Sequence, residues 1–234
     1  MTHKFVRVTI LLLALCGAAP VRAQSTAPLA PGERLPNLDK LKDQLKQYHD
    51  CVGASGCYAR DLDVEADRAI AFLERRAARN AKHEKLALVL DIDETTLSNY
   101  EEMLKAGFAY DAKAFDAWVA SEKAPAIPGT LRLFKDAKRL GVSVFFLTGR
   151  AENERAVTDQ NLQVQGFGGY TRLILRTAGE EKLTAVEYKS RERAKIAGNG
   201  YRIVLSVGDQ WSDLHGTPQA EYSVKYPNPY YFIP

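Results

Sequence analysis

The sequence predicts an α/β fold with a doubly wound parallel sheet. Short apolar segments of strand length, such as "LALVL" at 86–90 and "VSVFFL" at 142–147, alternate with longer segments whose apolar residues recur at helical spacing. The short segments lack the apolar–polar alternation of a half-exposed strand, so we expect a sheet covered by helices on both faces. The chain has 234 residues, 46% of them hydrophobic and 26% charged, which suits one globular domain with a sizeable core.

The first 36 residues are expected to precede this domain. Lys4 and Arg7 come before an apolar run at 8–15, and small residues follow the run. This pattern is typical of a secretory signal peptide cleaved after Ala23. A buried N-terminal helix is the alternative, but no polar face interrupts the run. Residues 24–36 are rich in proline and aperiodic, which predicts an extended lead-in.

Removal of residues 1–23 changes the charge of the chain. This segment holds three basic residues and no acidic one, so 29 of the 32 lysines and arginines remain against 29 acidic residues. A formally neutral mature chain gives no reason to expect nucleic-acid binding. The apolar run is too short for a comfortable membrane span, and Leu15 stands before Cys16 where a lipoprotein signal requires a small residue. We therefore expect a secreted or periplasmic protein without stable membrane insertion or a lipid at Cys16. No oligomeric state is indicated.

The mature chain keeps two cysteines, Cys51 and Cys57, separated by "VGASG". In an oxidising compartment such a pair is expected to close a small disulfide loop. Two free thiols or a metal-binding pair are the alternatives, although no further cysteine or histidine follows at the spacing of a zinc site.

The folded domain is expected to cover residues 37–234. Apolar residues recur at helical spacing over 38–48 and again over 62–77. Because both segments lie before the first strand, 37–84 is expected to form a small helical subdomain against an α/β core at 85–234.

Strands and helices then alternate through the core. After the first strand comes a helix-like region around Phe115, Trp118 and Val119, and this stretch is too short for a large cap domain. A Pro-Gly turn at 128–129 follows. The remaining elements are, in order, helix 130–140, strand 142–147, helix 152–165, strand 172–176, helix 185–197, strand 202–207 and a short strand near 222–226.

Polar residues gather where the predicted strands end, which is where open parallel sheets bind ligands. They are Asp91 and Asp93 after the first strand, Thr148, Gly149 and Arg150 after the second, Asp209 and Asp213 after "RIVLSV", and Lys189 near the start of the preceding helix. Two aspartates one residue apart after a buried strand repel each other. Their proximity costs free energy unless a cation or a phosphoryl group binds there.

The order of these residues resembles the four motifs of the haloacid-dehalogenase-like (HAD) phosphohydrolases: "DIDET", Thr148, Lys189 and "GDQWSD". Each motif is weak alone, but all four occur in order at a predicted strand or helix end. The segments "AIPGT", "FFLTGR", "TAVEYKS" and "YPNPYYFIP" narrow the resemblance to the subfamily IIIB acid phosphatases. That branch includes plant vegetative acid phosphatases and bacterial surface acid phosphatases and nucleotidases. The similarity covers about residues 37–234.

The resemblance implies a division of labour between the first two aspartates. Asp91 would be the nucleophile that forms an aspartyl-phosphate, and Asp93 would protonate the leaving group and then activate water. Mg²⁺ would be held by the Asp91 carboxylate, the Asp93 backbone carbonyl and Asp209, because oxygen ligands are what this ion prefers. Asp213 would hold a metal-bound water or orient Lys189.

Thr148, Gly149 and Lys189 are expected to bind the phosphoryl oxygens. Thr148 is also a candidate helix N-cap, which is compatible with that role, and Asp213 is a candidate turn cap. Tyr100, Trp118 and Arg150 are candidate substrate contacts, although the two aromatic residues are first of all core candidates. Their rings would suit a nucleobase or phenyl leaving group.

The resulting prediction is a secreted, magnesium-dependent acid phosphatase acting on a small phosphomonoester. Nucleoside monophosphates, aryl phosphates and sugar phosphates all remain open as substrates. A storage or ligand-binding protein on the same scaffold is the main alternative, but such a protein should have lost its nucleophile. A signalling receiver domain fits neither the D-x-D spacing nor the signal peptide. A dehalogenase would not need the acidic cluster, and a phosphonatase would need a lysine in a cap domain.

Overall fold

The computed structural model describes residues 34–52 and 56–234. The predicted signal peptide and most of the predicted lead-in lie outside the described residues. Leu38–Pro234 form one compact unit. No helix within the described ranges is long and apolar enough to cross a membrane.

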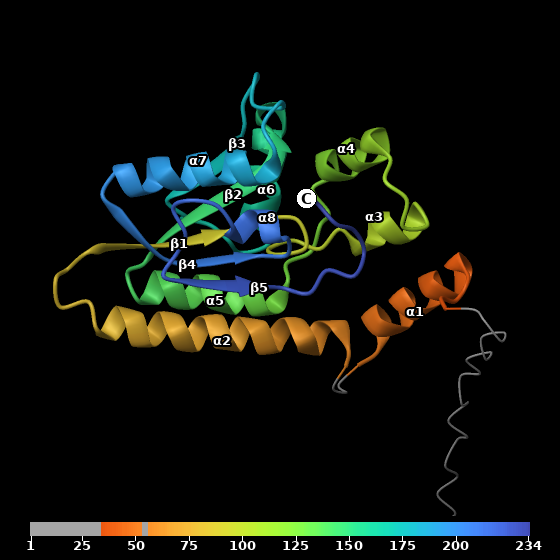
Figure 1. Cartoon of the computed structure of the whole chain (residues 1–234), viewed down its shortest axis with the longest axis horizontal. Coiled ribbons are helices and arrows are strands. Elements are labelled where there is room, and N and C mark those ends of the chain that lie inside the picture. Colours follow the sequence, from red (N-terminus) through yellow and green to blue (C-terminus); the bar gives the residue numbers. More distant parts are fainter. Residues whose placement is uncertain (1–33, 53–55) are drawn as a thin grey trace, which may run out of the picture. The chain divides into compact units, whose positions relative to one another are not determined.

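Five parallel strands form one sheet in the order β3-β2-β1-β4-β5 (Figure 1). The strands are β1 (Lys85–Leu90), β2 (Ser143–Ala151), β3 (Arg172–Arg176), β4 (Tyr201–Gly208) and β5 (Tyr222–Lys225). In the middle of the sheet Leu88 pairs with Val144 of β2 and with Leu205 of β4. The predicted doubly wound α/β fold is confirmed.

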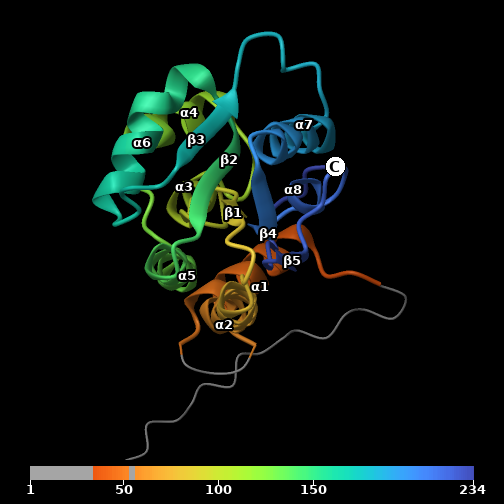
Figure 2. The same ribbon diagram turned by 90° about the vertical axis from the view of Figure 1, so that its left-hand side faces the viewer.

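Helices cover both faces of the sheet, which explains why the strands are apolar throughout. Alternate side chains of β1 point to opposite faces. Leu88 and Leu90 join one core cluster with α2 (Tyr58–Ala78), α5 (Pro128–Arg139) and α6 (Arg155–Val164), whereas Ala87 and Val89 join a second cluster with α7 (Ala185–Gly198). Figure 2 shows α2, α5 and α6 on one side of the sheet and α7 on the other.

The helix starts follow from local capping. Pro128 occupies the first turn of α5, where its missing N–H leaves no hydrogen bond unmade. At the start of α7, the Thr184 hydroxyl accepts a hydrogen bond from the Glu187 amide, and the Glu187 carboxylate accepts one from the Thr184 amide. This reciprocal capping box fixes the turn that carries Lys189, two residues further on.

The N-terminal helices are α1 (Leu38–Asp50) and α2, and Cys51 and Cys57 between them form a disulfide with a Cα–Cα distance of 5.5 Å. The predicted disulfide loop is confirmed. Five of the side chains of α2 are buried, and the helix packs against α5. Helix α2 is thus one element of the layer that covers the sheet.

Several elements differ from the sequence-based expectations. Helix α2 begins at Tyr58, and the predicted helix 152–165 is a short 3₁₀ turn, Glu152–Glu154, followed by α6. The helix-like region after β1 contains two helices, α3 (Tyr100–Lys105) and α4 (Ala112–Ala120). A one-turn helix, α8 (Trp211–Leu214), follows β4 and was not predicted.

Candidate active site

The site lies at the carboxyl ends of the central strands. From β1 the chain proceeds outward to β2 and β3 and then returns to the other side of β1 with β4 and β5. The order therefore reverses between β1 and β4, which is the position where doubly wound sheets bind ligands. The amide of Asp91 donates a hydrogen bond to the Val207 carbonyl at 3.0 Å, so pairing continues just past β1. Asp91 and Asp209 thus emerge side by side from neighbouring strands.

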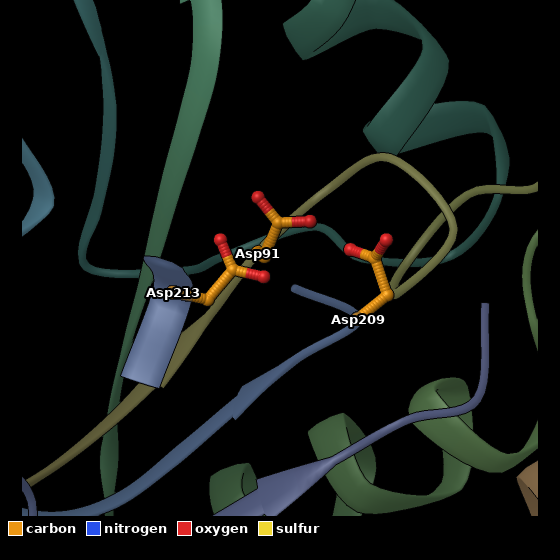
Figure 3. A group of neighbouring side chains, drawn as sticks. All are labelled: Asp91, Asp209 and Asp213. Atoms are coloured by element: carbon orange, nitrogen blue, oxygen red, sulfur yellow. The ribbon is translucent and has the colours of Figure 1, made fainter. Parts of the chain in front are cut away.

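Three buried carboxylates converge at this edge (Figure 3). Asp91 follows β1, Asp209 follows β4, and Asp213 lies in α8, and each offers one oxygen within 4.8 Å of the others. Lys189 of α7 lies among them: its Nζ donates a hydrogen bond to Asp91 Oδ1 at 2.6 Å and another to Asp213 Oδ1. The structure thus brings together four of the residues that the sequence singles out.

The charges of this group do not balance within the protein. Three carboxylates and one ammonium group are buried together, which leaves an excess of negative charge when all of them are ionised. Burial raises the pKa of Asp91 despite the opposing charge of Lys189, and burial together with Asp213 raises the pKa of Asp209 to about 6. The two aspartates bonded to Lys189 raise its pKa against the effect of burial. A divalent cation would offset the excess, and an all-oxygen donor set suits Mg²⁺.

Asp93 has different surroundings from Asp91. Ile92, which lies between them, is fully buried in the hydrophobic core. The Asp93 carboxylate accepts hydrogen bonds from Arg150 Nη2 at 2.7 Å and from Asn99 Nδ2 at 2.9 Å. Burial acts to raise the pKa of Asp93, but the Arg150 charge and these bonds outweigh it and lower the pKa. The Asp93 side chain is therefore turned toward Arg150, and its expected contribution to metal binding is limited to the backbone carbonyl.

Thr148 and Gly149 lie within β2, because this strand continues to Ala151 and does not end at 147 as the sequence predicted. The candidate N-cap role of Thr148 is therefore wrong, since the helical segments that follow begin after Ala151 and Glu154. Thr148 is fully buried, and its Oγ1 accepts a hydrogen bond from the Arg150 amide at 3.1 Å and lies 3.5 Å from Asp93 Oδ2. Gly149 lines the cavity above the site, and a Cβ atom built at this position would meet nothing within 4 Å. The backbone at Gly149 therefore borders free space beside the carboxylates.

A second set of polar residues, which the sequence does not single out, supports Asp93. Glu94 has a left-handed backbone with φ of 57°, a conformation that is strained for a residue other than glycine. Its buried carboxylate accepts hydrogen bonds from the Asn99 amide at 2.6 Å and from the Tyr231 hydroxyl at 3.0 Å. Burial and the neighbouring Asp93 raise the pKa of Glu94 to about 8. Glu94 and Asn99 belong to the same short segment as the first motif, and that adjacency is the signal that could have identified them.

A cavity of about 730 Å³ opens above the carboxylates. The catalytic candidates Asp91, Asp93 and Lys189 line its floor, together with Arg150. Its apolar lining comes from the α3–α4 region and from the C-terminal segment: Met103, Phe108, Tyr110, Phe115, Tyr230, Tyr231, Phe232 and Ile233. The cavity therefore combines a polar floor with aromatic walls.

A sequence profile of the HAD superfamily, subfamily IIIB (acid phosphatase), matches residues 23–234. The chain belongs to this family. Among curated relatives of this subfamily IIIB chain, "Acid phosphatase 1" of Solanum lycopersicum is 36% identical over 211 residues, which are 89% of this chain and 80% of the tomato protein. The "Stem 28 kDa glycoprotein" of Glycine max is 36% identical over 75% of this chain and 64% of that protein. "Vegetative storage protein 1" of Arabidopsis thaliana is 36% identical over 62% of this chain and 55% of that protein.

Solved structures agree on the fold. The class C acid phosphatase of Bacillus anthracis, with tungstate bound, superposes with a TM-score of 0.66 over 82% of this chain and 87% of that chain, at 24% identity. The match to the family profile and the 36% identity to the tomato enzyme confirm the predicted assignment to the subfamily IIIB acid phosphatases, and with it to the enzymes.

Two candidate substrate contacts of this subfamily IIIB chain lie away from the cavity lining. The Tyr100 ring stacks on His49 with centroids 3.3 Å apart, and its hydroxyl donates a hydrogen bond to Asp50. Trp118 Nε1 donates a hydrogen bond to Asn99 Oδ1 at 2.9 Å. Both rings are almost completely buried. Their contacts join α3 to α1 through His49, and α4 to the loop that contains Asn99. Arg150 does line the cavity, with its guanidinium bonded to Asp93.

Proposed function

We propose that this acid phosphatase is a magnesium-dependent, exported phosphomonoesterase that works through an aspartyl-phosphate. The observation that carries the proposal is the buried group of Asp91, Asp209, Asp213 and Lys189, of which Asp91, Asp213 and Lys189 line the floor of an aromatic cavity. A phosphoryl group needs a nucleophile, positive charge on its oxygens and room for its leaving group, and this site offers all three.

The reaction would proceed in two displacements at phosphorus. In the first, an Asp91 oxygen forms a bond to phosphorus while the ester oxygen leaves, and protonated Asp93 transfers its proton to that oxygen. Against the effect of burial, Arg150 lowers the Asp93 pKa, so Asp93 must regain this proton in each cycle, and the second displacement returns it. In the second, water attacks the phosphorus of the aspartyl-phosphate, Asp93 accepts a proton from the water, and the Asp91 carboxylate departs. Lys189, bonded to Asp91 Oδ1 at 2.6 Å, would neutralise phosphoryl oxygens that approach this carboxylate.

Asp91, Asp209 and Asp213, with the Asp93 backbone carbonyl, are the residues that would hold Mg²⁺. The bound ion would offset the charge of the carboxylates and of the incoming phosphate. Arg150 keeps the Asp93 side chain clear of this group, since three hydrogen bonds join the guanidinium to the Asp93 carboxylate.

The cavity walls favour a leaving group with a flat or apolar face. Phe108, Tyr110 and Phe115 come from the α3–α4 region, and Tyr230 and Phe232 come from the C-terminal segment. Nucleoside monophosphates and aryl phosphates present such a face, and aromatic pairs add about 0.5–1.5 kcal/mol beyond their buried area. A bare sugar phosphate presents less apolar surface to these walls.

The stem glycoproteins and vegetative storage proteins among the relatives keep a storage or binding role open as the second candidate. The presence of Asp91 and Asp93 argues against a storage role, because these are the two carboxylates that the proposed chemistry requires. A chain kept only for storage has no use for a buried, charge-unbalanced group at the end of its sheet.

A steady-state panel tests the proposal. The purified mature chain is assayed on p-nitrophenyl phosphate, AMP and glucose 6-phosphate, first after treatment with a chelator and then with added Mg²⁺. We expect no turnover without metal, and with Mg²⁺ a higher kcat/KM on the first two substrates. Full activity in metal-stripped protein would contradict the metal assignment, and no turnover on any substrate with Mg²⁺ would favour the storage role.

A further inference from the structure

We infer that the C-terminal segment, residues 226–234, supports the metal site through Asn228, which is a positioning residue for the metal-binding carboxylate of Asp209. The inference rests on the proposed magnesium requirement. It adds to that requirement a residue outside the four motifs, from a segment that otherwise contributes only to the cavity wall.

The start of the segment is fixed next to the site. Tyr226 is fully buried, and its amide donates a hydrogen bond to the Gly208 carbonyl at 2.9 Å, immediately before Asp209. Its hydroxyl lies 3.3 Å from Thr130 Oγ1 of α5. The chain that leaves β5 is therefore held against the end of β4, so that the residues that follow cross in front of Asp209.

Both ends of the Asn228 amide are used. Its Oδ1 accepts a hydrogen bond from the Tyr230 amide at 2.8 Å, which closes a turn of the segment. Its Nδ2 donates a hydrogen bond to Asp209 Oδ2 at 2.7 Å. One side chain thus fixes the path of the segment and the orientation of a carboxylate 19 residues away in sequence.

The bonds to Asp209 are divided between its two oxygens. Oδ2 accepts two amide donors, from Asn228 and from Gln210 Nε2 at 2.6 Å. Oδ1 accepts one hydroxyl donor, Thr95 Oγ1, at 3.1 Å. Two short bonds at one oxygen fix the plane of the carboxylate and leave the other oxygen with more free acceptor capacity. Groups that orient metal ligands in this way are a general requirement of metal sites.

Gln210, the second amide donor to Asp209 Oδ2, is itself bonded to the C-terminal segment. Its Oε1 accepts a hydrogen bond from the Ile233 amide at 3.0 Å, and its Nε2 lies 3.4 Å from the Tyr231 carbonyl. Both amide donors to Asp209 Oδ2 therefore depend on residues 228–233. The same residues supply aromatic walls of the cavity, so the segment couples the metal site to the leaving-group side of the site.

The test compares Asn228→Ser with Tyr226→Phe. A serine hydroxyl can still accept the hydrogen bond from the Tyr230 amide, but it is too short to reach Asp209. Tyr226→Phe removes a buried hydroxyl from the same segment and leaves Asp209 untouched. Mg²⁺ binding is measured by titration calorimetry, together with the rise in Tm on Mg²⁺ addition. kcat and KM on p-nitrophenyl phosphate are measured at saturating Mg²⁺.

We expect the Mg²⁺ Kd of Asn228→Ser to rise about 10- to 100-fold, with activity largely recovered at high Mg²⁺. Asn228→Ala should show the same rise in Kd, while Tyr226→Phe should lower the metal-free Tm and leave the Kd within about twofold of the wild type. The inference is overturned if Asn228→Ser binds Mg²⁺ like the wild type, if Tyr226→Phe weakens binding equally, or if Asn228→Ser shows no cooperative melting. A wild-type chain that binds no Mg²⁺ would overturn the proposed magnesium requirement as well.

Discussion

Asp91 and Asp93 stand one residue apart, yet the fold gives their carboxylates different partners. Asp91 is bonded to Lys189 and shares its space with Asp209 and Asp213. Asp93 is bonded to Arg150 and Asn99. The first environment suits a nucleophile beside a cation, and the second holds a proton-transfer group in one orientation. A conservative substitution at each position should therefore have different consequences.

We expect Asp91→Asn to abolish turnover on every substrate, because it replaces the nucleophilic oxygen and a metal ligand. Asp93→Asn should retain Mg²⁺ binding and lose proton transfer, a loss of about 10² to 10⁴ in rate. That loss should be larger for an alkyl phosphate than for p-nitrophenyl phosphate, whose leaving group departs without a proton. Steady-state kinetics on both esters measure the difference. Equal losses on the two esters would confine the proton-transfer role of Asp93 to the second displacement.

Lys189 is the only cation bonded to the carboxylate group among the described residues. Lys189→Met should destabilise the metal-free chain by about 3–5 kcal/mol, because removing one partner of a buried ion pair leaves its charge unbalanced. Added Mg²⁺ should restore part of the lost stability, because it replaces positive charge at the same place. Denaturant unfolding in chelator and in Mg²⁺ measures both effects. Lys182→Met, at an exposed position, is the control and should stay within about 0.5 kcal/mol. A Lys189→Met chain as stable as the control would show that Lys189 does not neutralise this group.

At the scale of elements, the strands could be predicted because burial on both faces makes them continuously apolar. Helix α8 could not, because four residues are too few to show a helical period. Asp91 and Asp209 were found because each follows a strand directly in sequence, and Asp213 was found through the motif that it shares with Asp209. The Tyr231–Glu94 hydrogen bond spans 137 residues, and the Asn228–Asp209 bond joins two loops. No local pattern records such contacts, because they arise only when the chain folds back on itself.

One link between elements predicts a pH dependence of stability. Arg76 of α2 bonds to Glu221, just before β5, at 2.7 Å, and Arg202 of β4 bonds to the same carboxylate. The hydrogen bond from Arg76 lowers the pKa of Glu221, and Arg202 adds to this against partial burial. A carboxyl group whose pKa is lower in the folded state stabilises the fold above its unfolded pKa of about 4.3, and this stabilisation is lost as pH falls through the folded value.

Arg76→Gln should therefore cost about 1 kcal/mol at neutral pH and less under acid conditions. Its free energy of unfolding should also fall less steeply than that of the wild type as the pH drops below about 5. Urea unfolding at a series of pH values measures the two slopes. The neighbouring Arg75→Gln, at an exposed position, serves as the control and should keep the wild-type slope. If the free energy of unfolding falls with pH at the same rate in Arg76→Gln and in the wild type, then Arg76 does not lower the pKa of Glu221.

At the scale of the whole molecule, the candidate site draws on distant parts of the chain. The segments that follow β1 and β4 supply its carboxylates, and β2 supplies Thr148 and Gly149. Helix α7 supplies Lys189, and the last residues supply Asn228 and part of the cavity wall. The disulfide between Cys51 and Cys57 joins α1 to α2, and α1 in turn places His49 on the ring of Tyr100 in α3. An enzyme that depends on this disulfide should mature in an oxidising compartment.

Cleavage of the signal peptide and formation of the disulfide both change the mass of the chain, so one mass measurement tests both. Residues 1–23 have the pattern of a signal peptide, so chain exported from a bacterial host should begin near Gln24 and lack two hydrogens at Cys51 and Cys57. Intact mass spectrometry without reductant reads both changes at once. Leu12→Arg places a charge in the apolar run and should leave the chain in the cytoplasm, with residues 1–23 retained and both thiols reduced. A lipid adduct at Cys16 would contradict this prediction, because it would show that the exported chain is anchored to a membrane. If the Leu12→Arg chain retains residues 1–23 and still forms the disulfide, then formation of the disulfide does not depend on export.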